Sequence, residues 1–264
     1  MAYVKGIVCF IDILGTKEKT FDELLFINEI FHKELDAFQK SQKSYYIKKQ
    51  VICFSDCAYI VYVIEGKMVK NKDILDYIVN ILFEIANTLL IHISNCYLCR
   101  GGITYGELYI EKNRNIIFGP AVNEAYLLEN RAKMPRIIID DVIVQIIKSK
   151  LSEKQMNIII EDIDKIYYLN YFIYFELINN GLNEYMEIYT RLVNYSKKII
   201  KETKKITIEK SIMEKHNWHI NFMHLTKEKL ELISRSGNKK SDRCGAYVKS
   251  LLYPRNEGNN SHIK

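Results

Sequence analysis

Long apolar runs, prolines and glycines are scarce in this sequence of 264 residues, which has 3 prolines and 11 glycines. No window approaches the roughly 18 consecutive apolar residues that a membrane span requires, so we expect neither a membrane segment nor a membrane partner. The N-terminal Met1-Ala-Tyr-Val-Lys5 leads directly into a strand-like segment and lacks the pattern of a signal peptide, which predicts a cytoplasmic location. Internal repeats and low-complexity segments are also absent.

The cysteines are not spaced as in a disulfide framework or a zinc ribbon. Cys96-Tyr-Leu-Cys99 has CxxC spacing, but no second pair lies at a zinc-ribbon distance from it. Without a secretory signal, a reduced state is expected. Cys9, Cys53 and Cys57 fall inside apolar strand patterns, and we expect them to be packed structural thiols.

Three histidines lie close together near the C-terminus, at His216, His219 and His224. A metal site would need further ligands, and no acidic or cysteine pattern accompanies them. We therefore expect them to lie on an ordinary helix surface.

The composition predicts a folded chain with a real core. Apolar residues make up 48% and aromatic residues 12% of the sequence, which excludes disorder over most of its length. The length suits one domain with additions, or two small domains. With 38 Lys and Arg against 32 Asp and Glu, the net charge is +6. This surplus fits a nucleotide or nucleic-acid partner, but it is too mild to decide between them.

Hydrophobic periodicity predicts the element order β-α-β-β-α-β in the first part of the chain. That order is typical of a ferredoxin-like core in the α+β class, with an antiparallel sheet and two helices on one face. The first helix should begin at the capping box Thr20-Phe-Asp-Glu23. The expected elements are a strand at 3–13, a helix from 20 to about 38, strands at 45–54 and 57–64, a helix at 73–92 and a strand at 96–110.

Further elements continue the pattern. A short strand at 116–118 precedes a helix that Pro120 opens and that runs to about Arg131, and another strand follows at 136–140. Glycines 101, 102 and 106 inside a strand predict a bulge or a close backbone approach. Beyond residue 150, a strand-like stretch at 157–178 precedes a mostly helical stretch at 182–233. We divide the chain into a core at 1–150, a β and helical extension at 151–233 that packs on it, and a polar tail at 234–264.

Two acids carry the chemistry. Asp12 ends the first strand and Asp56 lies at the hairpin, so the predicted strand order brings the carboxylates together at one end of the sheet. Such a pair favours Mg²⁺ or Mn²⁺ and can hold two ions about 4 Å apart for in-line attack at phosphorus. The amides of Leu14, Gly15 and Thr16 would receive phosphate oxygens. Taken singly, either acid also fits a turn or a helix cap; taken together, they favour the metal site.

At this point a family resemblance becomes specific. Four segments, in order over about residues 3–140, are similar to the motifs of class III nucleotidyl cyclases, the adenylate and guanylate cyclase family. The first two segments resemble the metal motifs, the third the strand before the dimerisation arm, and the fourth the Gly-x-x-Val-Asn-x-Ala-x-x-Leu-Glu helix. The segments are Phe10-Ile-Asp-Ile-Leu-Gly-Thr16, Phe54-Ser-Asp56, Arg100-Gly-Gly-Ile-Thr-Tyr-Gly-Glu-Leu108 and Gly119-Pro-Ala-Val-Asn-Glu-Ala-Tyr-Leu-Leu-Glu129.

The resemblance implies a reaction and a set of roles. Asp12 and Asp56 would bind two Mg²⁺ or Mn²⁺ ions, with the Ile13 carbonyl as a further ligand. Asn123 would come from the partner subunit and position the ribose of a nucleoside triphosphate. The 3′-oxygen of the nucleotide would attack its own α-phosphate and release pyrophosphate. Because the site is shared, the active form would be a symmetric head-to-tail homodimer.

Departures from the family pattern narrow the choice of nucleotide substrate. The transition-state Arg of the family is Leu127 here, and its two adenine-reading residues are Ile52 and Ile116. A purine edge would find no polar partner at those two positions. The combination resembles the pyrimidine cyclases of bacterial Pycsar anti-phage defence, and the segment Pro135-Arg-Ile137 fits that group. UTP and CTP both remain open as substrates, and the product would activate a separate effector.

The missing arginine needs a substitute, for which Arg100, Arg131 and Arg136 are the candidates. Arg100 is the one that we expect at the site as a catalytic group, because it lies in the motif strand.

Three alternatives stay open. A diguanylate cyclase or polymerase palm shares the topology, although Phe54-Ser-Asp-Cys-Ala58 stands where a Gly-Gly-Asp-Glu-Phe hairpin would be expected. A degenerate cyclase-homology module would bind nucleotide or partner proteins without catalysis, as Leu127 suggests. A nucleic-acid-binding protein is disfavoured, because no recognisable DNA- or RNA-binding motif is present.

Overall fold

The computed structural model describes residues 2–17, 19–41, 47–64, 71–111, 114–150, 156–203 and 210–236. Its first six elements follow the predicted β-α-β-β-α-β order, and further strands and helices continue from them. The elements are β1 (Val4–Ile13), α1 (Phe21–Ser41), β2 (Ile47–Phe54), β3 (Cys57–Ile64), α2 (Asn71–Ser94), β4 (Cys99–Glu111), β5 (Ile116–Phe118), α3 (Pro120–Ala132), β6 (Ile137–Ile139), α4 (Asp141–Lys150), η2 (Met156–Ile158), β7 (Ile159–Glu161), β8 (Tyr167–Leu169), α5 (Ile173–Leu177), α6 (Gly181–Thr203) and α7 (Lys210–Arg235).

One 8-stranded sheet connects the two parts of the chain, with the order β2-β3-β1-β4-β6-β8-β7 and β5 paired to β4. The first four strands pair antiparallel in the order β2-β3-β1-β4, which confirms the predicted α+β class and its βαββαβ core. Strand β6 joins β4 in parallel, and β8 and β7 extend the sheet beyond it. The extension therefore shares a sheet with the core.

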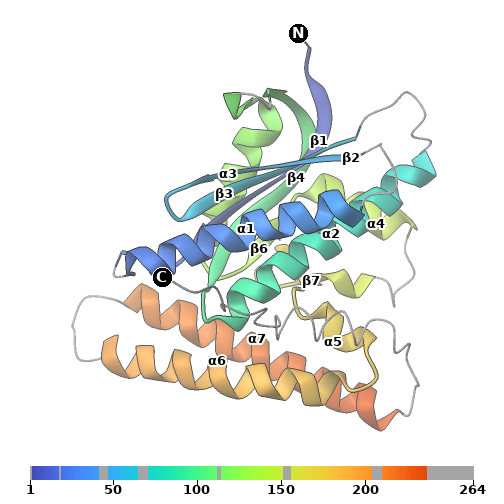
Figure 1. Cartoon of the computed structure of the whole chain (residues 1–264). Helices are drawn as coiled ribbons and strands as arrows, with labels where there is room; N and C mark the ends of the chain where they lie inside the picture. The colour runs from blue at the N-terminus through green and yellow to red at the C-terminus, as the bar shows by residue number, and fades with distance from the viewer. Residues whose placement is uncertain are drawn as a thin grey trace, which may run out of the picture.

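The two faces of the sheet are covered by different helices, as alternation along β1 requires. Ile7, Cys9 and Ile11 belong to a large cluster of buried side chains with α1 and α2. Val8 and Phe10 belong to a second cluster with Ala121, Val122 and Ala125 of α3. Figure 1 shows α1 and α2 crossing one side of the strands and α3 lying on the other. We call the second side the α3 face.

Glycines in β4 let α3 approach the sheet closely. A Cβ atom at Gly102 would lie 2.3 Å from Leu128 Cβ and 2.5 Å from the Ala125 carbonyl oxygen. A Cβ atom at Gly101 would lie 2.1 Å from the Phe10 carbonyl oxygen. The β1–β4 ladder continues without interruption past both glycines. Of the two structures that the sequence predicted here, the close backbone approach is confirmed and the bulge is not formed.

The extension differs most from expectation. The stretch 157–178 was expected to be strand-like, but it forms only the short strands β7 and β8, a turn of 3₁₀ helix and α5. Most of its Ile and Tyr side chains belong to the same core cluster as residues of α6 and α7, although Ile163 is 97% exposed, so its apolar character reflects core packing rather than long strands. Helices α6 and α7 run side by side beyond this edge of the sheet (Figure 1), as the helical prediction for 182–233 requires.

Several smaller predictions need correction. Helix α4 was not predicted, and α7 continues to Arg235, into the segment assigned to the polar tail. The rest of that tail, from residue 237, lies outside the described residues. His216 and His219 are 8% and 0% exposed, so these two residues face the core rather than the helix surface.

One helix satisfies the length and composition of a membrane span. Residues Ile74–Ser94 of α2 pass this test, although no apolar run of that length stood out in the sequence. Ile78, Leu82, Ile85 and Leu89 on this helix are fully buried against the sheet. In this fold the apolar character of α2 is therefore accounted for by its place in the core.

Candidate active site

The two predicted acids meet at one end of the α3 face. Asp12 near the end of β1 pairs with Cys57 at the start of β3, which places Asp56 at the turn beside it. The Ile13 amide donates to the Asp56 carbonyl oxygen at 3.0 Å and fixes this junction. Ligand atoms of Asp12, Asp56 and Cys57 all lie within 4.8 Å of one another. The predicted convergence of the two carboxylates is thus present, and a thiol lies with them.

The outer oxygen of each acid is held by a neighbour, while the other oxygen faces the shared space. Arg100 Nε lies 2.9 Å from Asp12 Oδ2, and the Thr16 hydroxyl donates to Asp56 Oδ2. The Cys57 thiol lies 3.3 Å from Asp12 Oδ1 and 3.8 Å from Asp56 Oδ1. The two Oδ1 atoms therefore converge on one region from opposite sides. Carboxylate oxygens are the ligands that Mg²⁺ and Mn²⁺ prefer, so this donor set fits a divalent cation.

Hydrogen bonding keeps Asp56 ionised. Partial burial pushes its pKa upward, but donors from Thr16, its own amide, Ser55 and Cys57 outweigh burial and leave the pKa below the ordinary value. The Cys57 thiol behaves in the opposite way, because burial and then the neighbouring charge of Asp12 raise its pKa. At neutral pH the group therefore offers carboxylates and a protonated thiol. Cys57 packs against the cluster of Val8 and Phe10, as expected of a structural thiol, and it also lies beside the acids, which was not predicted.

Arg100 links the acids to α3. Its Nε also lies 2.6 Å from Glu129 Oε1, on a side chain that is 4% exposed. Burial raises the pKa of Glu129, and the positive charge of Arg100 opposes that rise. Three acidic side chains, Asp12, Asp56 and Glu129, thus lie around the single guanidinium of Arg100. This imbalance at a partly open site favours a cation.

The turn after β1 offers fewer amides than expected. Leu14 donates its amide to the Leu98 carbonyl at 2.8 Å, so it is not available to a phosphate in this structure. Gly15, with φ of 74°, and Thr16 follow in the turn. Helix α1 begins only at Phe21, so the turn does not open directly onto a helix N-terminus as predicted. Gly15 and Thr16 remain as predicted phosphate contacts.

Helix α3 carries the other predicted catalytic residue. Asn123 lies in the first turn of α3, where its amide donates to the Gly119 carbonyl, and its side chain is exposed. Leu127, one turn later, is 52% exposed. The structure thus brings Asp12, Asp56 and Arg100 together and leaves Asn123 exposed near the start of α3, which packs beside Gly106 rather than beside Arg100.

Aromatic side chains lie next to the acids on the same face. Phe10 lies two residues before Asp12, and its ring centroid is 4.6 Å from that of Tyr59 and 6.3 Å from that of Phe54. Tyr126 of α3 contacts Phe10 edge-on at 5.8 Å. Phe54 is 50% exposed, so it is not a core residue, although its ring stacks near those of Phe10 and Tyr59. We call Phe10, Phe54, Tyr59 and Tyr126 the aromatic cluster.

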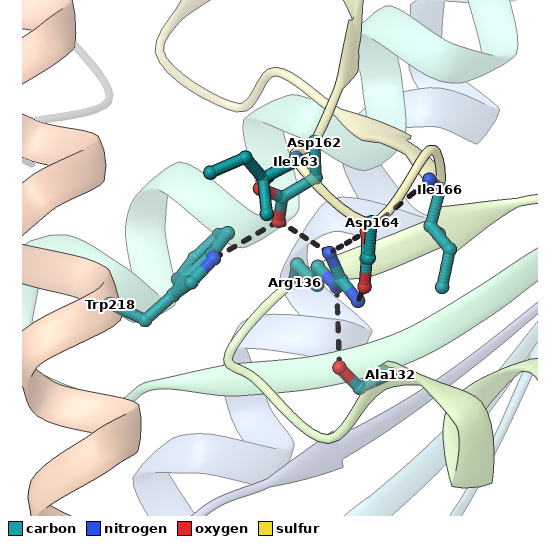
Figure 2. A network of polar contacts seen from close by, with 7 residues as sticks. All are labelled: Ala132, Arg136, Asp162, Ile163, Asp164, Ile166 and Trp218. Atoms are coloured by element: carbon teal, nitrogen blue, oxygen red, sulfur yellow. Dashed lines mark hydrogen bonds and ion pairs between the residues drawn. The ribbon is translucent and has the colours of Figure 1, made fainter.

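The three candidate arginines occupy different environments. Arg100 lies at the acids, and Arg131 is exposed in the last turn of α3. Arg136 is 3% exposed and bound to Asp162 and Asp164 of the extension (Figure 2). Arg136 is therefore committed to a structural contact and cannot replace the missing arginine at a substrate.

Comparison with known proteins finds similar solved structures but no matching family model or curated protein. No protein-family model and no curated protein matches the chain. Among solved structures, the chain is 19% identical to the catalytic core of a rhodopsin-guanylyl cyclase with converted specificity in complex with ATPalphaS, with a TM-score of 0.40, covering 64% of this chain and 97% of that one. It is 18% identical to a bacterial light-regulated adenylyl cyclase, with a TM-score of 0.37, covering 65% of this chain and 92% of that one. The function is therefore argued from the side chains of the site.

Proposed function

We propose that this chain is a nucleotidyl cyclase of the class III type that converts UTP or CTP to the 3′,5′-cyclic nucleotide and pyrophosphate. The observation that carries the proposal is the convergence of the Asp12 and Asp56 Oδ1 atoms beside Arg100, within segments that resemble the cyclase motifs. The product would serve as a second messenger in bacterial anti-phage defence and act on a separate effector.

Each residue of the site has a proposed role in this reaction. Asp12 and Asp56 would hold two Mg²⁺ or Mn²⁺ ions, with the Ile13 carbonyl as a further ligand. These ions would lower the pKa of the attacking 3′-hydroxyl and neutralise charge at the α-phosphate. Arg100 would leave Asp12 and turn toward the triphosphate, and the amides of Gly15 and Thr16 would hold phosphate oxygens.

Apolar surface supports a pyrimidine base at this site. Ile52 is partly exposed on β2. In contrast, Ile116 on β5 pairs with Glu111 at the far end of β4 from Arg100 and would reach a site only in a partner chain. Neither can pair with the polar edge of a purine. The half-exposed ring of Phe54 offers a stacking surface for a smaller ring.

A homodimer is supported by the surface around α3. Tyr126 and Leu127 are 49% and 52% exposed, and Phe118 of the β4–β5 hairpin is 48% exposed beside Tyr3. Burying these side chains against a second copy would bring Asn123 to the partner's site, where it would position the ribose. The site within one chain would then be completed by its partner.

A second candidate is the degenerate module. Leu127 supports it, because the position expected to stabilise the transition state is apolar. The paired acids weigh against it, since a binding module would have no need of two converging carboxylates.

The test is to incubate the protein with Mn²⁺ and each of ATP, GTP, CTP and UTP, and to identify the products by mass. We expect a cyclic pyrimidine nucleotide that is lost in Asp12→Asn and Asp56→Asn. Asp22→Asn, an exposed acid on α1, is the matched control and should behave as the wild-type protein. No cyclic product from any nucleotide, with metal bound and the protein folded, would favour the degenerate module.

A further inference from the structure

An ion cluster around the buried Arg136 joins the extension to the core. Arg136 immediately precedes β6, and its guanidinium bonds to Asp162 and to both oxygens of Asp164 in the β7–β8 turn. Its Nε also donates to the Ala132 carbonyl at the end of α3, at 3.2 Å. Trp218 of α7 donates from its indole nitrogen to Asp162 Oδ2 at 3.0 Å. Figure 2 shows these groups converging on Arg136, which we call, with Asp162, Asp164 and Trp218, the Arg136 cluster.

The same arginine supports the proposed active site through its backbone. The Arg136 carbonyl accepts from the Gly101 amide at 3.1 Å, directly next to Arg100. The Ala132 carbonyl that Arg136 holds lies one turn after Glu129, the acid that contacts Arg100. The backbone and the guanidinium of Arg100 are thus both held by segments that meet at Arg136.

We propose that Arg136 is a positioning residue for Arg100, and that α7 controls it through the Trp218–Asp162 hydrogen bond. This inference rests on the proposed cyclase function and adds a role for the extension. A shift of α7 would move Asp162, release the end of α3 and change the place of Arg100 relative to Asp12. The α6–α7 hairpin is therefore the part of the chain through which a signal can reach the site.

The chain supplies its own probe of this coupling, because Trp218 is its single tryptophan. Trp218 also packs edge-on against Tyr168 at 5.5 Å, so its surroundings include both the cluster and the sheet. If the coupling exists, binding of Mn²⁺ and nucleoside triphosphate at the acids should change the tryptophan emission. The change should saturate together with binding measured by calorimetry.

Kinetics of full-length variants separate positioning from stability. Trp218→Phe keeps an aromatic ring but removes the N–H donor, and Asp164→Asn weakens the hold on Arg136. We expect kcat to fall about tenfold in both, while the Mn²⁺ affinity and the KM for nucleotide change less than about twofold. Tyr189→Phe is the matched control on the same hairpin, because it removes an exposed hydrogen bond to His224. Arg136→Ala is avoided, because it would leave two acids unpaired and threaten folding.

The outcomes are distinct from those of the proposed function. If the wild-type protein makes a cyclic nucleotide and the two cluster variants fold with wild-type kcat, the inference is overturned and the cyclase proposal stands. A loss of kcat that matches the loss of thermal stability in all three variants also overturns it. If the wild-type protein makes no cyclic nucleotide, the cyclase proposal fails. The emission titration with Mn²⁺ and nucleotide then still decides whether the acids and α7 communicate.

Discussion

Two arginines in this molecule meet acids in opposite ways. Arg100 is 30% exposed and lies between Asp12 and Glu129, and the Oδ1 atoms of Asp12 and Asp56 both lie near the Cys57 thiol. Arg136 is 3% exposed and is surrounded by acceptors from two segments, the β7–β8 turn and the end of α3. Both clusters combine arginine and carboxylates, but among the described residues only the first groups three potential metal-binding side chains, Asp12, Asp56 and Cys57, within 4.8 Å.

This difference distinguishes a site that can bind a cation from a charge cluster that holds two segments of the fold together. A buried charge pair with its hydrogen bonds satisfied fixes one arrangement and gains little from any ligand. A partly exposed group with excess negative charge is stabilised when a cation arrives. Acids beside an arginine therefore predict a cation site only once the exposure of the side chains and the partners of each carboxylate oxygen are known.

The largest expected effect is a loss of Mn²⁺ binding together with nearly all turnover, which should follow substitution of an acid near Arg100 but not of an acid near Arg136. Asp56→Asn should lower turnover about 1,000-fold, because a neutral amide holds a metal poorly and the transition-state charge is left uncompensated. Asp164→Asn should keep Mn²⁺ affinity and lower turnover only about tenfold. Calorimetric Mn²⁺ titration and turnover assays of both variants measure the contrast. Equal Mn²⁺ affinities in Asp56→Asn and the wild-type protein would remove the site from this end of the sheet.

The next effect concerns the close approach of α3 to the strand that carries Arg100. Gly102→Ala would place a methyl group 2.3 Å from Leu128 Cβ, so α3 must move, at a cost of about 3 kcal/mol. Gly106→Ala on the same strand is the control, because its nearest contact would be 3.4 Å away, at Ala121 Cβ. Urea unfolding compares the two variants. Similar losses in both would mean that packing of α3 against Gly102 does not hold the site.

A smaller effect tests the helix that carries Trp218. Burial lowers the pKa of His219 to about 3, and neither ring nitrogen has a hydrogen-bond partner among the described residues. As the pH falls through the unfolded value near 6.5, the unfolded chain takes up a proton that the folded chain refuses, so stability is lost. At pH 5 this amounts to about 2 kcal/mol.

Removing the titrating group should reduce that loss. Between pH 7 and pH 5, His219→Leu should lose about 2 kcal/mol less unfolding free energy than the wild-type protein. His224→Gln, an exposed position on the same helix, should follow the wild-type protein. An unchanged pH dependence in His219→Leu would show that this histidine is not buried in neutral form.

The smallest effect concerns the start of α1, which follows the turn at the acids. The Glu23 amide donates to the Thr20 hydroxyl at 3.3 Å and the Thr20 amide to Glu23 at 2.9 Å, as the capping-box pattern predicted. Thr20→Ala should cost about 1 kcal/mol. Thr190→Ala, within α6, should cost less, because its hydroxyl only bonds to a carbonyl of its own helix. Thermal unfolding resolves the difference, and equal losses would contradict the capping role.

Prediction from sequence succeeded where the pattern was local and strong. A continuous apolar run predicted β1, the capping box and helical spacing predicted α1, and the strand order followed from the sequence of elements. The convergence of Asp12 and Asp56 also followed, because antiparallel pairing of β1 and β3 forces it.

The rest depended on contacts between distant segments. Arg136 is held away from the site because it bonds to Asp162 and Asp164, more than twenty residues along the chain. No local sequence pattern links these acids to the arginine. The Leu14 amide donates to the Leu98 carbonyl, just before β4. The spacing of residues in the sequence does not reveal this contact. Cys57 could have been found, because it pairs with Asp12 once the hairpin register is written out.

The most direct test of the account is a crystal structure of the protein with Mn²⁺ and a non-hydrolysable pyrimidine triphosphate, in which anomalous scattering locates the metal. The account predicts metal peaks between the Asp12 and Asp56 carboxylates, with Arg100 directed toward the triphosphate. Metal and nucleotide bound elsewhere, with the Arg100–Asp12 ion pair intact and the acids empty, would contradict it.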